Sequence, residues 1–159
     1  NNMPDRIINF PLTKVYTSTD VDVPTLGERY QDPTTGSQYI FLTGVASTVA
    51  GDPVIYDSAF ATTRLAGSGV GPVAIALAAT VASCKGWYQI YGTGSAKVVA
   101  TGGVAAFTST VTGQLLATVV TGALIHGMNT VSGTGNTVTG SLTSVTLNYP
   151  YVDRASGSY

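Results

Sequence analysis

The chain is poor in charged residues. Asp, Glu, Lys and Arg make up 9% of its 159 residues, against about 25% in a typical soluble domain. The formal net charge is −1 and the isoelectric point is about 5.6. Binding to nucleic acid needs a basic surface that neutralises phosphates. We therefore expect no direct contact with nucleic acid.

Cysteine and histidine are scarcer still, because Cys84 and His126 are the only ones in the chain. One cysteine permits no intrachain disulfide. A zinc site usually takes three or four Cys, His, Asp or Glu ligands. We therefore expect no metal and no other cofactor. Cys84 is interpreted as a structural thiol, and His126 as a hydrogen-bonded residue in a strand.

Long apolar runs are also missing, since none reaches the 18 residues typical of a transmembrane helix. The first ten residues lack the basic and then apolar layout of a signal peptide. The sequence therefore predicts no association with a membrane.

The few charges are unevenly placed. Eight of the fifteen charged residues lie within the first 32 positions, whereas residues 58–152 hold only Arg64, Lys85 and Lys97. Glycoside hydrolysis usually needs two carboxylates, and a serine triad needs an acid behind its histidine. We therefore expect no enzyme activity. The neutral body is either a β-domain with a hydroxyl-rich surface or a contact surface within an assembly, where charges are depleted.

Small and hydroxyl-bearing residues are abundant, with 19 glycines, 24 threonines and 13 serines. Glycine-rich turn signals recur between short β-branched and aromatic segments, which favours a β-sandwich or a β-barrel. We predict an all-β domain over residues 33–152. Its expected strands are residues 38–42, 54–57, 61–65, 73–82, 86–92, 97–101, 104–108, 115–120, 123–128, 137–142 and 145–149.

The two ends of the chain differ from this body. Residues 1–32 contain Pro4, Pro11 and Pro24, and each proline biases its predecessor toward extended backbone. This segment is predicted either to form an extended N-terminal arm or to supply the first strands of the domain. Residues 153–159 are expected to form a loose C-terminal tail.

Two local patterns bear on chemistry. Gly92-Thr93-Gly94 begins a G-x-G pattern, but a β-branched run follows it where a dinucleotide site needs a helix. It is interpreted as a hairpin turn. The aromatic residues could form a platform for stacking sugars, or they could serve in core packing and interface contacts; they are Trp87, Tyr88, Tyr91, Tyr149 and Tyr151.

Four segments carry a resemblance to a known family. They are residues 71–80 (GPVAIALAAT), 86–92 (GWYQIYG), 96–98 (AKV) and 147–152 (LNYPYV). Together they resemble the head decoration, or cement, proteins of tailed bacteriophages, over roughly residues 50–152. The shared segments are structural and bring no catalytic residues with them.

The resemblance implies a β-barrel or β-sandwich protein, often a homotrimer, on the outer surface of the capsid of a virion. There it would bind the major capsid protein and clamp neighbouring subunits. As candidates for the capsid interface we take Arg6, Ile7, Ile8, Phe10, Val15 and Tyr16. As candidates for the contact between copies we take Tyr88, Tyr91, His126, Tyr149 and Tyr151. The alternative function is an adhesive module displayed on a virion, such as a head fibre or a carbohydrate-binding domain.

Overall fold

The computed structural model describes residues 11–99, 105–109, 111–117, 123–130 and 141–153. The described residues contain ten strands and no helix, which confirms the predicted all-β class. The strands are β1 (Arg29–Gln31), β2 (Gln38–Thr43), β3 (Pro53–Tyr56), β4 (Thr62–Arg64), β5 (Gly71–Ala76), β6 (Lys85–Val98), β7 (Ala105–Thr108), β8 (Leu115–Leu116), β9 (Leu124–Thr130) and β10 (Ser141–Val152).

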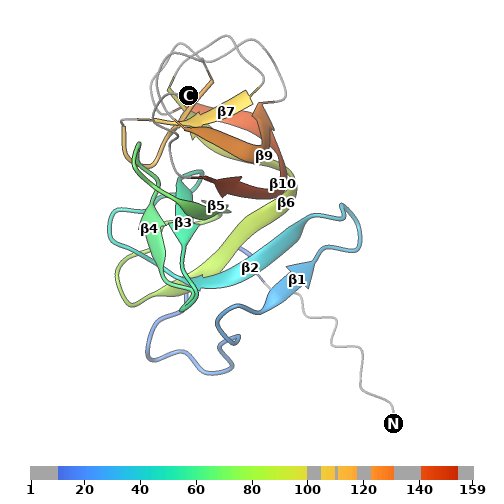
Figure 1. The fold of residues 1–159 in the computed structure, drawn as a ribbon. Helices are drawn as coiled ribbons and strands as arrows, with labels where there is room; N and C mark the ends of the chain where they lie inside the picture. The colour runs from blue at the N-terminus through green and yellow to red at the C-terminus, as the bar shows by residue number, and fades with distance from the viewer. Residues whose placement is uncertain (1–10, 100–104, 110, 118–122, 131–140, 154–159) are drawn as a thin grey trace.

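All ten strands belong to one mixed sheet that curls into a partial ring (Figure 1). The order is β1-β2-β6-β8-β7-β9-β10-β5-β3-β4, and β6 also pairs with β10 and β5. Strands β6, β8, β7, β9 and β10 thereby form a ring of neighbours, in which β8 joins β6 through the single parallel pair Val98↔Leu115. β1 and β4 remain as the edges of the sheet.

The long strand β6 runs between the two ends of the molecule (Figure 1). Its first half pairs with β2 and its second half with β10, from Tyr91↔Asn148 to Val98↔Ser141. The hairpin turn predicted at Gly92-Thr93-Gly94 is therefore wrong. These small residues continue the strand, because β10 supplies a partner for each of them.

Both faces of β2 are buried. One face packs against other strands, and the other is covered by the N-terminal segment. Ile40 and Leu42 pack with β3, β5 and β6 in one apolar cluster. Tyr39 and Phe41, on the opposite face, pack in a second cluster with Tyr16. Residues 11–28 thus cover this face, with Leu12, Val23 and Leu26 packed against the same cluster.

The placement of residues 11–32 bears on the alternatives for the N-terminal segment. Tyr16 pairs with Lys85 through two backbone hydrogen bonds of 2.8 Å, and residues 29–31 form β1. Residues 11–32 are therefore docked on the body and supply its first strand. Residues 1–10 and 154–159, which hold the remainder of the predicted arm and most of the tail, lie outside the described residues.

Several strand boundaries differ from the prediction, and the following two differ most clearly. The strand expected over residues 73–82 ends at Ala76, because residues 77–84 turn the chain back into β6. The two strands expected near the C-terminus are one, since β10 runs from Ser141 to Val152 with an irregular register between Leu147 and Tyr151.

The largest apolar cluster is lined by the ring strands and by β5. Alternate residues of β6 point into it, as Ala96 and Val98 do, and Val145 and Leu147 of β10 face them. Successive side chains of a strand point to opposite faces, so the residues between these buried ones point to the outer surface. On β6 the first of these outward residues is Tyr91.

Candidate functional site

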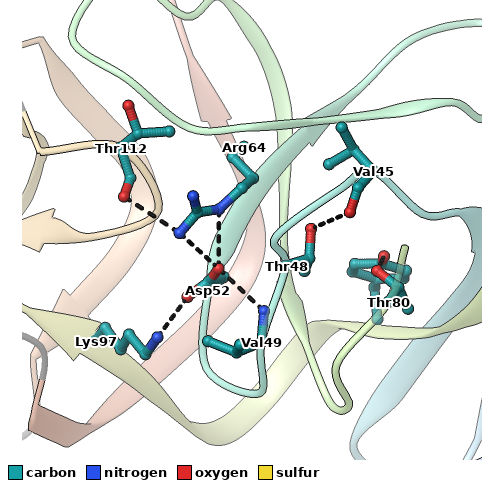
Figure 2. A network of polar contacts seen from close by, with 9 residues as sticks. Val45, Thr48, Val49, Asp52, Arg64, Thr80, Lys97 and Thr112 are labelled. Carbon is teal, nitrogen blue, oxygen red and sulfur yellow. Dashed lines mark hydrogen bonds and ion pairs between the residues drawn. The ribbon is translucent and has the colours of Figure 1, made fainter. Parts of the chain in front are cut away.

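A buried carboxylate joins three separate parts of the sheet (Figure 2). Asp52, directly before β3, is fully buried. Its Oδ2 accepts hydrogen bonds from Arg64 Nε at 3.0 Å and from the backbone N–H of Val49 at 3.1 Å. Its Oδ1 forms an ion pair with Lys97 Nζ at 2.9 Å. We call Asp52, Arg64 and Lys97 the Asp52 cluster.

The backbone around Asp52 fixes this carboxylate in place. Gly51 adopts a φ of 88°, which suits glycine, and its N–H donates to the carbonyl of Ala76 at 2.8 Å. The N–H of Ala76 donates in turn to the carbonyl of Asp52 at 2.9 Å. The N–H of Lys97 donates to the carbonyl of Gly51 at 3.0 Å. Backbone hydrogen bonds alone therefore hold this loop against β5 and β6.

Arg64 extends the cluster to a fourth segment. Its Nη2 donates to the carbonyl of Thr112 at 3.4 Å (Figure 2). Gly113 has a φ of 74°, which suits glycine, and a Cβ there would overlap the Arg64 guanidinium. Within the cluster, Oδ2 of the Asp52 carboxylate accepts hydrogen bonds, whereas Oδ1 has the ion pair with Lys97 but no hydrogen bond. The chemistry of the cluster is that of a cross-link between β4, β6 and the loop before β3.

The second notable site is an exposed group of tyrosines. The rings of Tyr91 and Tyr149 lie 5.3 Å apart at an interplanar angle of 34°. The hydroxyl of Tyr149 donates to Gln38 Oε1 at 2.7 Å, and Arg29 lies over the same ring at 5.9 Å. We call Arg29, Gln38, Tyr91 and Tyr149 the tyrosine patch; it draws one residue each from β1, β2, β6 and β10.

The backbone under the patch is unusual. Tyr149 has a φ of 46°, in the left-handed region that bulky residues rarely adopt. It lies where β10 shifts its register against β9. Gly127 of β9 has a φ of 74°, and a Cβ there would overlap the carbonyl oxygen of Asn148. Local strain of this kind concentrates at functional positions. Tyr149 is nevertheless 47% exposed, so its own burial does not account for the strained conformation.

The structure brings together part of the set predicted for the contact between copies. Tyr91 and Tyr149 are in contact, and Tyr151 and His126 are cross-strand partners. All four are exposed. His126 Nε2 also lies 3.0 Å from Asp153 Oδ2; both side chains are open to solvent, so this contact has little energetic weight.

Two of the predicted contact residues are corrected by their burial. Tyr88 is fully buried, its hydroxyl lies 3.0 Å from Thr80 Oγ1, and burial raises its pKa. Tyr16 packs edge-on against Phe41, with ring centroids 5.3 Å apart. Both side chains serve the core and are not available as surface contacts.

The other residues predicted for the capsid interface are placed only in part. Val15 is half-buried in the segment that covers β2. The remaining four, Arg6, Ile7, Ile8 and Phe10, lie outside the described residues.

The Asp52 cluster is not predicted from the sequence. Gly51-Asp52-Pro53 indicates only a turn, and no local pattern marks partners 12 and 45 positions away. One global signal was available. Residues 58–152 hold only three charges, and two of them, Arg64 and Lys97, contact Asp52.

Two further properties concern only the described part of the chain. No group of three His, Cys, Asp or Glu side chains is arranged there to hold a metal ion. No helix in that part is long and apolar enough to cross a membrane.

Comparison of the chain with family models, with curated proteins and with solved structures gave no match. The family resemblance therefore rests on the four segments described above. In the structure, their most specific element, residues 86–92, lies in β6. Trp87 and Tyr88 are buried on opposite faces of that strand. Gln89 donates to the carbonyls of Tyr91 and Thr93 at 3.2 and 3.1 Å. These residues build the fold and, apart from Tyr91, leave no side chain for recognition.

Proposed function

We propose that this chain is a structural virion protein that binds the outer surface of an assembled phage capsid and clamps neighbouring major capsid subunits. In this proposal the protein is a homotrimer, and the tyrosine patch lies in the contact between copies. A ligand that binds the assembled shell but not its parts stabilises the shell by mass action.

The observation that carries the proposal is the tyrosine patch. Tyr149 is 47% exposed, yet its ring and hydroxyl are held by Tyr91, Arg29 and Gln38. Exposed aromatic residues that are already fixed in position lose little conformational entropy on binding. Tyrosine and arginine are also enriched among the residues that dominate binding energy at interfaces. The patch therefore has the composition and the rigidity of a contact surface.

The scarcity of charge supports the same proposal. Of the three cations between residues 58 and 152, Arg64 and Lys97 are bound to Asp52 and do not face outward as free charges. Charged residues are depleted in the cores of protein interfaces. A body of this composition suits close contact with neighbouring subunits.

The capsid contact is assigned to Arg6, Ile7, Ile8, Phe10 and Val15. Deletion of residues 1–10 tests this assignment, because it spares Leu12 and Tyr16, which pack in the apolar cluster over β2. The deleted protein is expected to remain folded and trimeric but to lose its binding to capsids.

The experiment combines light scattering after gel filtration with co-sedimentation on expanded, undecorated heads from a panel of tailed phages. We expect a mass of about three times 16.2 kDa and stoichiometric sedimentation with one set of heads. Tyr149→Asn should lower the mass toward that of one chain, because asparagine accepts a positive φ but lacks the ring. Val21→Asn, at a side chain that is 81% exposed and is not part of the patch, is the control. A monomer that stays in the supernatant with every head would overturn the proposal.

A second candidate function is an adhesive module, favoured by the adjacent exposed rings of Tyr91 and Tyr149. Aromatic faces can stack on sugars, although Arg29 also occupies part of the space over Tyr149. A glycan array separates the two functions. A glycan that binds the wild-type protein but not Tyr149→Asn would favour adhesion, and an array without such a glycan would set it aside.

A further inference from the structure

A pocket of about 200 Å³ lies between the N-terminal segment and the start of β6. Its two walls are joined by the paired backbone hydrogen bonds between Tyr16 and Lys85, both 2.8 Å long. The pocket is smaller than the roughly 300–1,000 Å³ of sites for drug-sized ligands. It therefore suits a small molecule or a single side chain. Its lining residues are Tyr16, Thr17, Ser18, Val23, Ser83 and Lys85.

The charge of Lys85 is not neutralised within the described part of the chain, where no carboxylate lies within ion-pair distance of it. Asp20 of the docked segment is already engaged. Its Oδ1 lies 3.0 Å from Lys14 Nζ, and its Oδ2 accepts from the backbone N–H of Thr17 at 2.7 Å. Lys85 is thus a lining residue of the pocket whose positive charge has no carboxylate partner among the described residues.

The other lining groups complement that charge. The hydroxyls of Ser18 and Ser83 are potential donors, and neither has a hydrogen-bond partner among the described residues. Ser83 has a φ of 70°, so the turn that leads into Lys85 is locally strained. Val23 and Tyr16 add apolar surface to the wall.

This combination fits a carboxylate better than a phosphate. Phosphate sites typically use arginine forks or several convergent backbone N–H groups, and this pocket offers one ammonium group. A carboxylate carries a single charge, and a short aliphatic stem behind it would contact the apolar wall. The ammonium group would pair with the carboxylate while a hydroxyl donates to its second oxygen.

We propose that this pocket, which we call the Lys85 pocket, binds a carboxylate on a short aliphatic stem. Lys85 is the counter-ion, and Ser18 and Ser83 are the hydrogen-bond donors. The proposal does not depend on the capsid function, because it rests only on the cavity and the charges around it. The carboxylate can belong to a free small acid or to an acidic side chain of a protein partner.

The test is a titration of the isotope-labelled full chain with propionate, followed by backbone amide NMR at constant ionic strength. We expect saturable shifts at residues 16–18 and 83–85, with a dissociation constant on the order of millimolar for one ion pair with hydrogen bonds. Propionamide, which has the same shape without the charge, should cause no such shifts. Inorganic phosphate should bind more weakly than propionate.

Two variants with the same change in net charge make the test specific. Lys85→Gln should weaken propionate binding at least ten-fold, while its backbone pairing with Tyr16 and its thermal midpoint are retained. Arg154→Gln makes the same change in net charge within the predicted C-terminal tail and should leave the binding unchanged. Equal binding by wild type and Lys85→Gln, or shifts that never saturate, would overturn the proposal.

A capped glutamate, with both backbone ends blocked, distinguishes the two sources. If it displaces propionate from the pocket, an acidic side chain of a protein can occupy the site. If propionate binds and the capped residue does not, the ligand is a free small acid.

Discussion

Replacing Asp52 with asparagine would remove the charge from the Asp52 cluster while nearly preserving the shape of the side chain. The carboxylate is fully buried, and the side chains of Arg64 and Lys97 are only 24% and 20% exposed. The amide oxygen of the new asparagine could still accept from the N–H of Val49, but two partly buried cations would lose their counter-ion. Breaking a buried ion pair by removal of one partner costs about 3–5 kcal/mol.

The lower end of this range applies, because both cations retain some contact with water. We therefore expect Asp52→Asn to lower the free energy of unfolding by about 3 kcal/mol. For a domain of this size, that corresponds to a fall of roughly 6–12 °C in Tm. Lys97→Met should cost less, about 1.5 kcal/mol, because Arg64 and Val49 still bind the carboxylate.

Urea unfolding followed by circular dichroism measures these differences, provided that the m-value stays constant. Asp22→Asn is the control, since Asp22 is exposed and asparagine tolerates its φ of 55°. It should change stability by less than about 0.5 kcal/mol. The double variant Asp52→Asn/Lys97→Met should cost less than the sum of the two, because Lys97 has no counter-ion to lose once the carboxylate at position 52 is gone.

The same measurement in 0.5 M NaCl separates a buried cluster from a surface one. Salt screens exposed charges strongly and buried pairs much less, so the loss caused by Asp52→Asn should largely persist. A loss below about 1 kcal/mol at low salt would refute the reasoning. It would mean that water stabilises the three charged side chains about as well as they stabilise one another.

Two further predictions concern single positions. In thermal unfolding, Gly127→Ala should destabilise the protein by about 2 kcal/mol more than Gly36→Ala. Both glycines have a φ of 74°, but only the new Cβ at position 127 would overlap the carbonyl oxygen of Asn148. Equal losses of stability would contradict the placement of β9 against β10. The pKa of Asp20 is lowered from 3.8 to about 2, mainly by the hydrogen bond from the backbone N–H of Thr17. Its contribution to stability should therefore be present above the unfolded pKa, near 4, and be lost as the pH falls through 2; a carboxyl NMR titration that gives a value near 4 would disagree.

The class of the fold could be predicted because turn residues separate β-branched and aromatic segments. The prediction failed where small residues lie inside a strand. Gly94 is such a residue, since the side chain of Gln89 fills the space that a Cβ would need. Pairing with Val145 of β10 keeps Gly94 in the ladder. A partner 51 positions away decides the local structure here, and local propensity cannot reveal it.

The docking of residues 11–28 could have been predicted from β2 itself. Its sequence, QYIFLT, has apolar residues on both faces, where a half-exposed strand would alternate. Tyr39 and Phe41 therefore require a cover, and the short apolar pieces before residue 30 were available to provide it. The prolines that suggested an arm are compatible with this role, because an irregular segment can cover a sheet face.

The candidate sites were predictable to different extents. Tyr91 and Tyr149 were predicted as candidates for the contact between copies, but their contact with each other depends on the register of β6 against β10. The Asp52 cluster depends on three elements that meet only in the folded chain. Local sequence patterns cannot predict such a cluster, because an ion pair places no requirement on the residues that flank either partner in the sequence.

The interaction partners of the Lys and Arg side chains connect these observations. In the described part of the chain, Lys14, Arg64 and Lys97 each have a carboxylate partner, whereas Arg29 lies over a tyrosine ring and Lys85 has no such partner. These two cations without a carboxylate therefore belong to the tyrosine patch and to the Lys85 pocket. A chain with 9% charged residues gains little electrostatic steering from its net charge of −1. Recognition at the tyrosine patch and at the Lys85 pocket should accordingly depend on Arg29 and Lys85, and the affinity at each surface should respond to salt as one or two ion pairs would.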